Sequence, residues 1–263
     1  MASILKFQDM KKLSKGISMV TCYDYWSARI IDGTNIDAIL VGDSLAMVMH
    51  GHKDTILATV ELMCMHVGAV ARGAKQKTII VDMPFLSFRK GLTDSMNSVL
   101  RIIQSGAHAI KIEGAKGNLE LISHIVESGI PVMGHLGLTP QFVNQLGGFK
   151  VQGKQKEEEE EILQSAIALE RSGCFAIVLE CIPAKLAGVI TEKLQIPTIG
   201  IGAGPSVSGQ VLVLQDMLGM NSGFSPKFLK TYLDGYQMIK NALNDFDEEV
   251  KTEKFPLENH CYY

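Results

Sequence analysis

Short runs of apolar residues recur along the chain, separated by segments whose apolar positions follow a helical spacing. Each run is rich in β-branched residues and ends at a polar residue or a glycine, which is typical of parallel strands buried on both faces. The pattern predicts eight strands, at residues 17–23, 38–41, 78–81, 109–112, 130–133, 176–179, 197–201 and 211–214.

Helical segments lie between most of these runs and have recognisable ends. Residues 59–72 begin with a threonine N-cap, and glycine follows the segments 93–105, 118–128 and 156–172. A further helix is predicted at 226–250. Strands alternating with helices predict a (β/α)8 TIM barrel, with a doubly wound open sheet as the alternative.

The barrel is favoured because polar, chemically capable residues follow nearly every strand along the whole chain. An open sheet would gather them near one switch point. No linker or low-complexity tract interrupts the sequence, so we expect a single barrel domain over residues 1–263, with a C-terminal helical extension and tail. We expect the acidic run 157–161 to be a solvated helix start.

The amino-acid composition argues against two classes of binding partner, nucleic acids and anionic membranes. The 263 residues are 46% hydrophobic and 20% charged, with a net charge of -3, so no basic surplus suggests nucleic acid or an anionic membrane. The five cysteines are scattered without a C-x-x-C pair, which suits a reducing compartment. With no signal-peptide pattern and no membrane-spanning apolar run, we expect a cytoplasmic protein without nucleic-acid or membrane partners.

The run at 109–112 leads directly into charge. Because side chains alternate along a strand, Lys111 and Glu113 point to one face while Ile110 and Ile112 point to the other. Opposite charges on one face of a buried strand are costly to desolvate without compensation. Taken alone, the pair fits a structural ion pair as well as a functional site.

Other strands end in a similar way. Asp43, Asp82 and Glu113 are carboxylates that follow or end three consecutive strands. Brought together at one barrel rim without a cation, they would repel one another and raise one another's pKa. A hard divalent ion resolves that conflict, and a set of oxygen ligands favours Mg²⁺. For Asp43 alone, capping of the next helix is the alternative.

The remaining strand ends offer further candidates. Lys111 beside a metal site is an anchor for an anionic substrate, with a Schiff-base nucleophile as the alternative. His135 is either a core histidine or a site residue, and its place at a strand end favours the site. Glu180 closes an apolar run and is either a structural partner or a base, a choice that the residues alone leave open. We expect the glycine-rich stretch 200–204 to be a tight turn and not a phosphate cradle.

Eight stretches taken together resemble the ketopantoate hydroxymethyltransferase (3-methyl-2-oxobutanoate hydroxymethyltransferase) family. They are 21–24 (TCYD), 41–45 (VGDSL), 82–85 (DMPF), 111–114 (KIEG), 134–141 (GHLGLTPQ), 147–153 (GGFKVQG), 179–183 (LECIP) and 200–204 (GIGAG). The resemblance runs from about residue 16 to the carboxyl end, and the order of so many matches makes it specific.

The resemblance implies a (β/α)8 barrel that assembles as a homo-oligomer, commonly a decamer. The implied reaction transfers a hydroxymethyl group from 5,10-methylenetetrahydrofolate to 3-methyl-2-oxobutanoate, giving 2-dehydropantoate through a Mg²⁺-stabilised enolate. By the same resemblance Asp43, Asp82 and Glu113 bind Mg²⁺. The oxo acid is held by Ser44 and Lys111 and by the metal on Asp43 and Asp82. Glu180 is the proton acceptor, and His135 falls in an active-site motif.

Three positions depart from the family pattern, without loss of a charged group. Ala46 stands where glycine is usual, Leu57 replaces an expected proline, and Ser225 interrupts the pattern before 226–228. The resemblance does not assign the folate-binding residues. Two other readings are a Mg²⁺-dependent oxo-acid barrel of the phosphoenolpyruvate mutase and isocitrate lyase group, and an oxo-acid-binding barrel without turnover.

Overall fold

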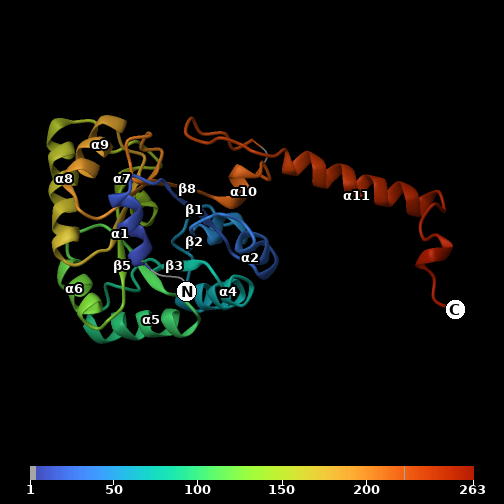
Figure 1. The fold of residues 1–263 in the computed structure, drawn as a ribbon, viewed down its shortest axis with the longest axis horizontal. Coiled ribbons are helices and arrows are strands. Elements are labelled where there is room, and N and C mark those ends of the chain that lie inside the picture. Colours follow the sequence, from blue (N-terminus) through green and yellow to red (C-terminus); the bar gives the residue numbers. More distant parts are fainter. Residues whose placement is uncertain (1–3, 222) are drawn as a thin grey trace. The chain divides into compact units, whose positions relative to one another are not determined.

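Eight parallel strands close into a barrel in the computed structural model, which describes residues 4–221 and 223–263 (Figure 1). Each strand pairs with the next, and β8 returns to β1. The predicted (β/α)8 barrel is confirmed, and the open sheet is excluded. The strands are β1 (Ile17–Thr21), β2 (Ala38–Val41), β3 (Thr78–Asp82), β4 (Ala109–Glu113), β5 (Val132–Gly137), β6 (Ala176–Glu180), β7 (Thr198–Ile201) and β8 (Gly209–Leu212).

Two predicted strands are displaced. β5 was expected at 130–133 but runs over Val132–Gly137, because its backbone pairs with β4 and β6 through the glycines that looked like terminators. His135 therefore lies within the strand. β8 starts two residues earlier than expected, at Gly209, where a side chain would place its Cβ 2.4 Å from the Ile17 carbonyl oxygen. The absent side chain permits the pairing that closes the barrel.

The four predicted internal helices are confirmed to within a residue or two. They are α4 (Val60–Gly73), α5 (Leu92–Gln104), α6 (Leu119–Glu127) and α8 (Lys156–Arg171). Thr59 caps α4 by accepting from Leu62 N, as its sequence suggested. In α8, Glu158 accepts from the backbone at the helix start, so its exposed acidic run has the expected structural role.

Further helices lie outside the predicted set. They are α1 (Leu5–Lys12), α2 (Tyr25–Asp32), α3 (Leu45–Val48), α7 (Val143–Leu146), α9 (Ala184–Lys193), α10 (Leu214–Met217), and the short 3₁₀ helices η1 (Pro140–Phe142) and η2 (Glu258–His260). The helix expected at 226–250 is wrong in its first part. Only α11 (Gly235–Lys251) is helical, because the amides of Tyr232 and Gly235 bond to the carbonyls of Met217 and Leu218.

Apolar side chains fill the barrel up to the level of the predicted site. The inward positions Met19, Leu40, Ile80, Met133 and Val178 belong to one buried cluster. Phe7 of α1 packs edge-to-face on Phe175, just before β6, with ring centroids 5.6 Å apart. Because α1 closes the amino-terminal end of the strands, the carboxyl end is left for chemistry.

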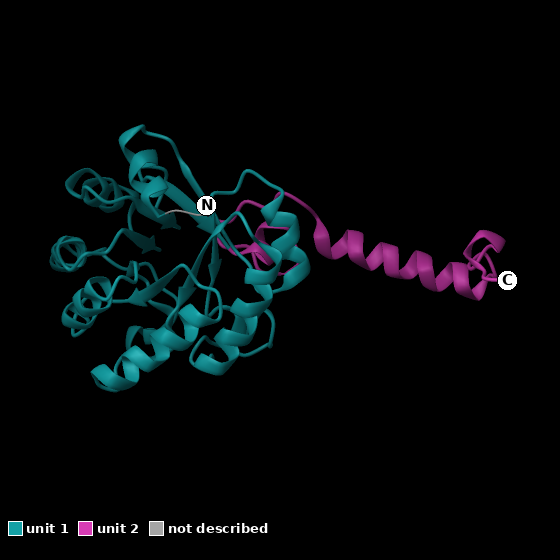
Figure 2. Ribbon diagram, turned by 60° about the horizontal axis from the view of Figure 1, so that its bottom comes forward, with its two compact units in different colours: residues 1–212 teal, residues 213–263 magenta. Residues whose placement is uncertain are grey.

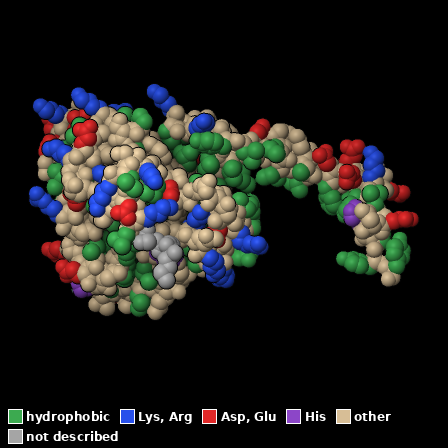
Figure 3. Space-filling view, in the orientation of Figure 1, with side chains coloured by type: hydrophobic (Ala, Val, Ile, Leu, Met, Phe, Trp, Pro, Cys, Tyr) green, Lys and Arg blue, Asp and Glu red, His purple; other side chains and the backbone are tan. Residues whose placement is uncertain are grey.

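The chain divides into two compact units, Met1–Leu212 and Val213–Tyr263 (Figure 2). The first holds the barrel, and the second holds α10, α11 and the tail. Helix α11 exposes an apolar stripe with alternating spacings of three and four residues: Tyr236, Ile239, Leu243, Phe246 and Val250. Figure 3 shows green, hydrophobic side chains along this part of the chain. Among the described residues, no helix is both long and apolar enough to cross a bilayer.

The burial of Phe7 yields a stability prediction. Phe7→Ala should lower the free energy of unfolding by about 3–5 kcal/mol, because the ring is 2% exposed and its removal opens a cavity against Phe175. Urea denaturation followed by circular dichroism measures this change. Leu5→Ala on the same helix is the control, since Leu5 is 70% exposed and its loss should cost about 0.5 kcal/mol or less. Equal losses in the two variants would contradict the plug role of α1.

Candidate functional site

A layer of ionisable side chains covers the apolar interior at the carboxyl ends of five consecutive strands, β2 to β6. On β4, Lys111 and Glu113 continue the inward positions that begin at Ala109, as the alternation along the strand predicts. This layer, called the charged layer below, consists of Asp43, Asp82, Lys111, Glu113, His135 and Glu180. The structure thus brings the predicted charged residues together at one rim.

Burial differs within the charged layer. Asp43, Asp82, Lys111, Glu113 and His135 are each 4% exposed or less. The side chain of Glu180 is 20% exposed. One carboxylate therefore stands at the open edge of the layer while the other three lie beneath it.

Lys111 is held as a cation. Its Nζ lies 2.9 Å from Asp82 Oδ1, an ionic contact without the alignment of a hydrogen bond. Burial lowers the pKa of Lys111, but the carboxylates of Asp82, Glu113 and Asp43 outweigh it and raise the pKa above its usual value. A Schiff-base nucleophile requires the free amine, so these surroundings favour an electrostatic anchor.

His135 links Lys111 to Glu180. Its Nδ1 lies 2.9 Å from Lys111 Nζ, and its Nε2 lies 3.2 Å from Glu180 Oε2. Burial and Lys111 lower the pKa of His135, whereas the carboxylates of Glu113 and Glu180 raise it, to about 9. The Lys111 contact favours the opposite state, because an ammonium at 2.9 Å needs a lone pair on Nδ1. We favour this neutral ring, with its proton on Nε2 toward Glu180, since two cations cannot share that distance in a buried site.

Asp43 shows the electrostatic conflict of the layer most clearly. Burial, followed by repulsion from Asp82 and Glu113, raises the pKa of Asp43 well above its ordinary value. The side chain caps no helix, because α3 begins at Ser44 without a side-chain cap. The helix-cap alternative for Asp43 is therefore wrong, and its carboxylate contacts Gln141 instead of a helix end.

The donor set fits a hard divalent cation. Three buried carboxylates with only oxygen donors are the ligands that Mg²⁺ prefers, and a cation would relieve the repulsion that raises the pKa of Asp43. In the part of the chain that the structure describes, no three His, Cys, Asp or Glu side chains are grouped closely enough to hold a metal ion by themselves. Mg²⁺ commonly uses one or two carboxylates and takes its other ligands from water and substrate, so an open set is sufficient.

Gln141 is a functional candidate that the sequence reading did not single out. Its side chain is buried, and Nε2 donates to Asp43 Oδ2 at 2.8 Å and to the Met83 carbonyl at 2.9 Å. Its backbone N donates to Glu113 Oε2 at 3.1 Å. One residue thus orients two carboxylates of the layer, although only its place in the stretch 134–141 marked it in the sequence.

Ser44 is placed beside the layer by a close approach of two strands. Its Oγ lies 2.8 Å from the hydroxyl of Tyr23. At Gly42 a side chain would put its Cβ 2.8 Å from Ser44 Oγ and 3.3 Å from Asp82 Oδ2. Glycine therefore allows the backbone amide of Asp43 to donate to Asp82 Oδ2 at 3.1 Å.

Two other strand-end features have structural roles. Asp24 caps α2 by accepting from the backbone N of Ser27 at 2.9 Å. The glycine-rich stretch 200–204 is a non-helical segment in which Gln210 Nε2 donates to the Gly204 carbonyl. We keep the tight-turn interpretation of that stretch.

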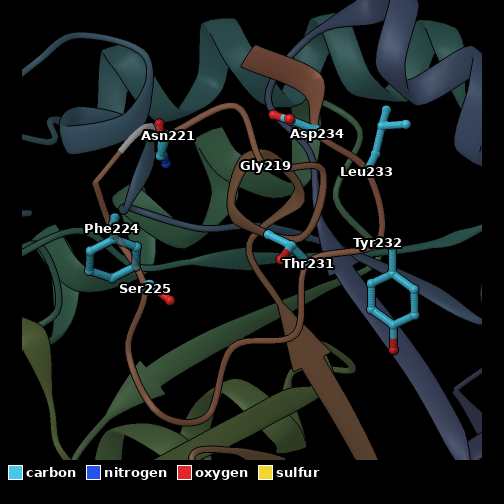
Figure 4. Close-up of a pocket in the computed structure, with 8 residues that line it drawn as sticks. All are labelled: Gly219, Asn221, Phe224, Ser225, Thr231, Tyr232, Leu233 and Asp234. Carbon is cyan, nitrogen blue, oxygen red and sulfur yellow. The ribbon is translucent and has the colours of Figure 1, made fainter. Parts of the chain in front are cut away.

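The departures from the family pattern leave the charged layer untouched. Ala46 is buried in α3, a right-handed helix in which a glycine is not needed. Leu57 is 54% exposed. Ser225 lines a pocket of about 510 Å³ in the C-terminal unit, where Phe224 and Tyr232 also stand (Figure 4). No residue of the charged layer lines that pocket.

Comparison with solved structures agrees with the barrel fold. Solved structures with a similar fold include phosphonopyruvate hydrolase, with a TM-score of 0.64 at 9% identity over 100% of this chain and 92% of the other. A 2,3-dimethylmalate lyase of the phosphoenolpyruvate mutase and isocitrate lyase superfamily gives 0.59 at 14% identity, over 97% and 89%. At such low identity these likenesses show the barrel fold alone.

Sequence relatives are far closer. The 3-methyl-2-oxobutanoate hydroxymethyltransferase of Coxiella burnetii is 63% identical over 97% of both chains, and that of Bdellovibrio bacteriovorus is 59% identical over the full length of both. The model of the family described as ketopantoate hydroxymethyltransferase matches residues 2–258. The chain therefore belongs to the ketopantoate hydroxymethyltransferase family.

Proposed function

We propose that this barrel transfers a hydroxymethyl group from 5,10-methylenetetrahydrofolate to 3-methyl-2-oxobutanoate, in a Mg²⁺-dependent reaction that gives 2-dehydropantoate. The observation that carries the proposal is the continuity of the charged layer. A fixed cation, a set of buried carboxylates and a more exposed carboxylate are joined through His135. Together with family membership, this is the arrangement needed to bind an oxo acid and remove a proton from it.

Asp43, Asp82 and Glu113 would hold the Mg²⁺. When bound, the ion polarises the ketone of the oxo acid and stabilises the negative charge that develops on its oxygen. The structural neighbour phosphonopyruvate hydrolase was solved in complex with oxalate and Mg²⁺, which supports a site for a small carboxylate and a metal on this fold.

The chain's own groups supply the remaining functions. Lys111, charged and buried, attracts the substrate carboxylate, and Ser44 offers a hydroxyl beside it. Glu180 removes the C3 proton from the open edge of the layer. His135 Nε2 lies 3.2 Å from Glu180 Oε2 and would orient that carboxylate. The C3 carbanion bonds to the one-carbon unit of methylenetetrahydrofolate, the C–N bonds to that carbon break so that tetrahydrofolate leaves, and water supplies the hydroxyl of the product.

The assembly proposal rests on α11. Its exposed apolar stripe is a surface that water covers poorly, and association of copies would bury it. We therefore keep the homo-oligomer, a decamer by family resemblance, and the cytoplasmic location as parts of the proposal.

Metal removal gives the first test of the proposed reaction. EDTA treatment should reduce both hydroxymethyl transfer and C3–H exchange of the oxo acid to the rate seen without enzyme, and added Mg²⁺ should restore both. The reason is that no side chain of the layer can replace a divalent charge at the ketone. Proton NMR in D₂O follows the exchange. Undiminished exchange by metal-free enzyme would contradict the metal requirement.

Gln141→Leu should weaken Mg²⁺ binding about 10–100-fold, as is usual when a group that orients metal ligands is lost. Leucine keeps much of the volume but removes the donor to Asp43. Titration calorimetry with Mg²⁺ and the oxo acid measures the affinity independently of turnover. Gln145→Leu, four residues away and exposed, is the matched control. Wild-type affinity in a folded Gln141→Leu protein would show that Gln141 does not position the ligands.

Glu180→Gln should slow C3–H exchange by about 10²–10⁴-fold, because the amide keeps the shape of the side chain but accepts no proton. Binding of the oxo acid should survive, since Lys111 and the metal ligands remain. NMR exchange with Mg²⁺ and without folate measures the rate, and calorimetry measures the binding. Exchange at the wild-type rate would make Glu180 structural and His135 the next candidate base.

A further inference from the structure

A pocket of about 360 Å³ lies beside the loop that follows α7. It includes part of the stretch 147–153, one of the family-like motifs that the Mg²⁺ and oxo-acid site does not use. We call it the lysine pocket, and its lining includes Leu146, Lys150, Val151, Gln152, Lys154 and Glu158. Its function is not explained by the reaction steps described so far.

The lysine pocket is fixed to the segment that carries the proposed base. The backbone N of Gln152 donates to the Cys181 carbonyl at 2.9 Å, one residue after Glu180. Gly153 follows with a φ of +72°, where a side chain would place its Cβ 2.9 Å from Ile162 Cδ1 and from Leu186 Cδ2. The wall of the pocket therefore packs closely on the barrel beside the proton-accepting edge of the charged layer.

As far as the structure describes the chain, the lysine pocket contains two lysines without an ion-pair partner and one glutamate that accepts a backbone hydrogen bond. Lys150 and Lys154 are exposed, and neither ammonium forms an ion pair among the described residues. Glu158 accepts from the backbone N of Lys154 at 3.0 Å as part of the cap of α8, so its carboxylate has a structural partner. Leu146 and Val151 add apolar surface. The combination suits a ligand with an apolar body and carboxylate ends.

We infer that the lysine pocket binds the benzoyl-glutamate tail of the folate co-substrate, an inference that rests on the proposed function. The folate must place its methylene carbon against C3 of the oxo acid, close to Glu180. Its tail then has to leave along the neighbouring rim. There the aromatic ring packs on Leu146 and Val151, and the glutamate carboxylates pair with Lys150 and Lys154.

The folate-independent exchange separates this inference from the proposed function. Lys150→Gln and Lys154→Gln should each raise KM for methylenetetrahydrofolate about twofold to fivefold, and the double variant more, because each loses one ammonium–carboxylate contact at an exposed site. KM for the oxo acid should not change, and C3–H exchange without folate should keep the wild-type rate. Lys156→Gln, which removes the same charge from an exposed residue outside the pocket lining, is the matched control.

A truncated donor tests whether the lysines act on the glutamate itself. Wild-type enzyme should use methylenetetrahydropteroate, which lacks the glutamate, with a KM about tenfold or more above that for methylenetetrahydrofolate. The double variant should discriminate little between the two donors. A polyglutamylated donor should bind wild-type enzyme at least as well as the monoglutamate, and added salt should reduce these preferences.

Each adverse result has a distinct meaning. Unchanged KM for methylenetetrahydrofolate in the double variant, with exchange and transfer intact, would overturn the lysine pocket as the tail site and leave the proposed function standing. Equal donor discrimination in wild type and double variant would also overturn it. Wild-type enzyme that shows neither exchange nor transfer would overturn the proposed function, and the pocket assignment with it.

Discussion

Charge balance in a space without water is the constraint on which the rest of this structure depends. Asp43, Asp82 and Glu113 meet at one end of a packed barrel, and Lys111 supplies the cation that makes their burial tolerable. Removing water strengthens every interaction among these groups, whether attractive or repulsive. The apolar layers below the charged layer and helix α1 offset this cost. They supply the buried apolar surface that stabilises the fold, whereas the charged rim does not.

The position of many site residues could be predicted from the sequence, because side chains alternate between the two faces of a strand. The two-residue alternation of 109–113 correctly placed Lys111 and Glu113 on one inward face, and the parallel barrel then gathered the other strand ends. The proposed chemical roles of these residues were harder to predict from the sequence pattern. Proton acceptance by Glu180 came from family resemblance, because a carboxylate after an apolar run is also a common structural feature.

The parts that escaped prediction share a physical cause. β5 was misplaced because glycines end many strands, whereas here Gly134 pairs with both β4 and β6, and Gly137 pairs with Glu180 of β6. Gln141 was missed because an uncharged side chain in a turn carries no sequence signal of a site role. Its role is evident only in the fold, where its Nε2 lies 2.8 Å from Asp43 Oδ2. The segment 226–234 had a helical composition, yet long-range backbone bonds to 217–218 held it in another form. Tertiary contacts decided each case, and local pattern could not.

The buried position of Asp43 sets the stability of this protein against its function. Its carboxylate is repelled by two neighbours and deprived of water, so in the absence of a bound cation it works against the folded state. Selection for thermal endurance alone would accept a neutral side chain at that place and would remove a proposed Mg²⁺ ligand in doing so. An acid at this position therefore fits a functional requirement of the barrel better than a requirement of its stability.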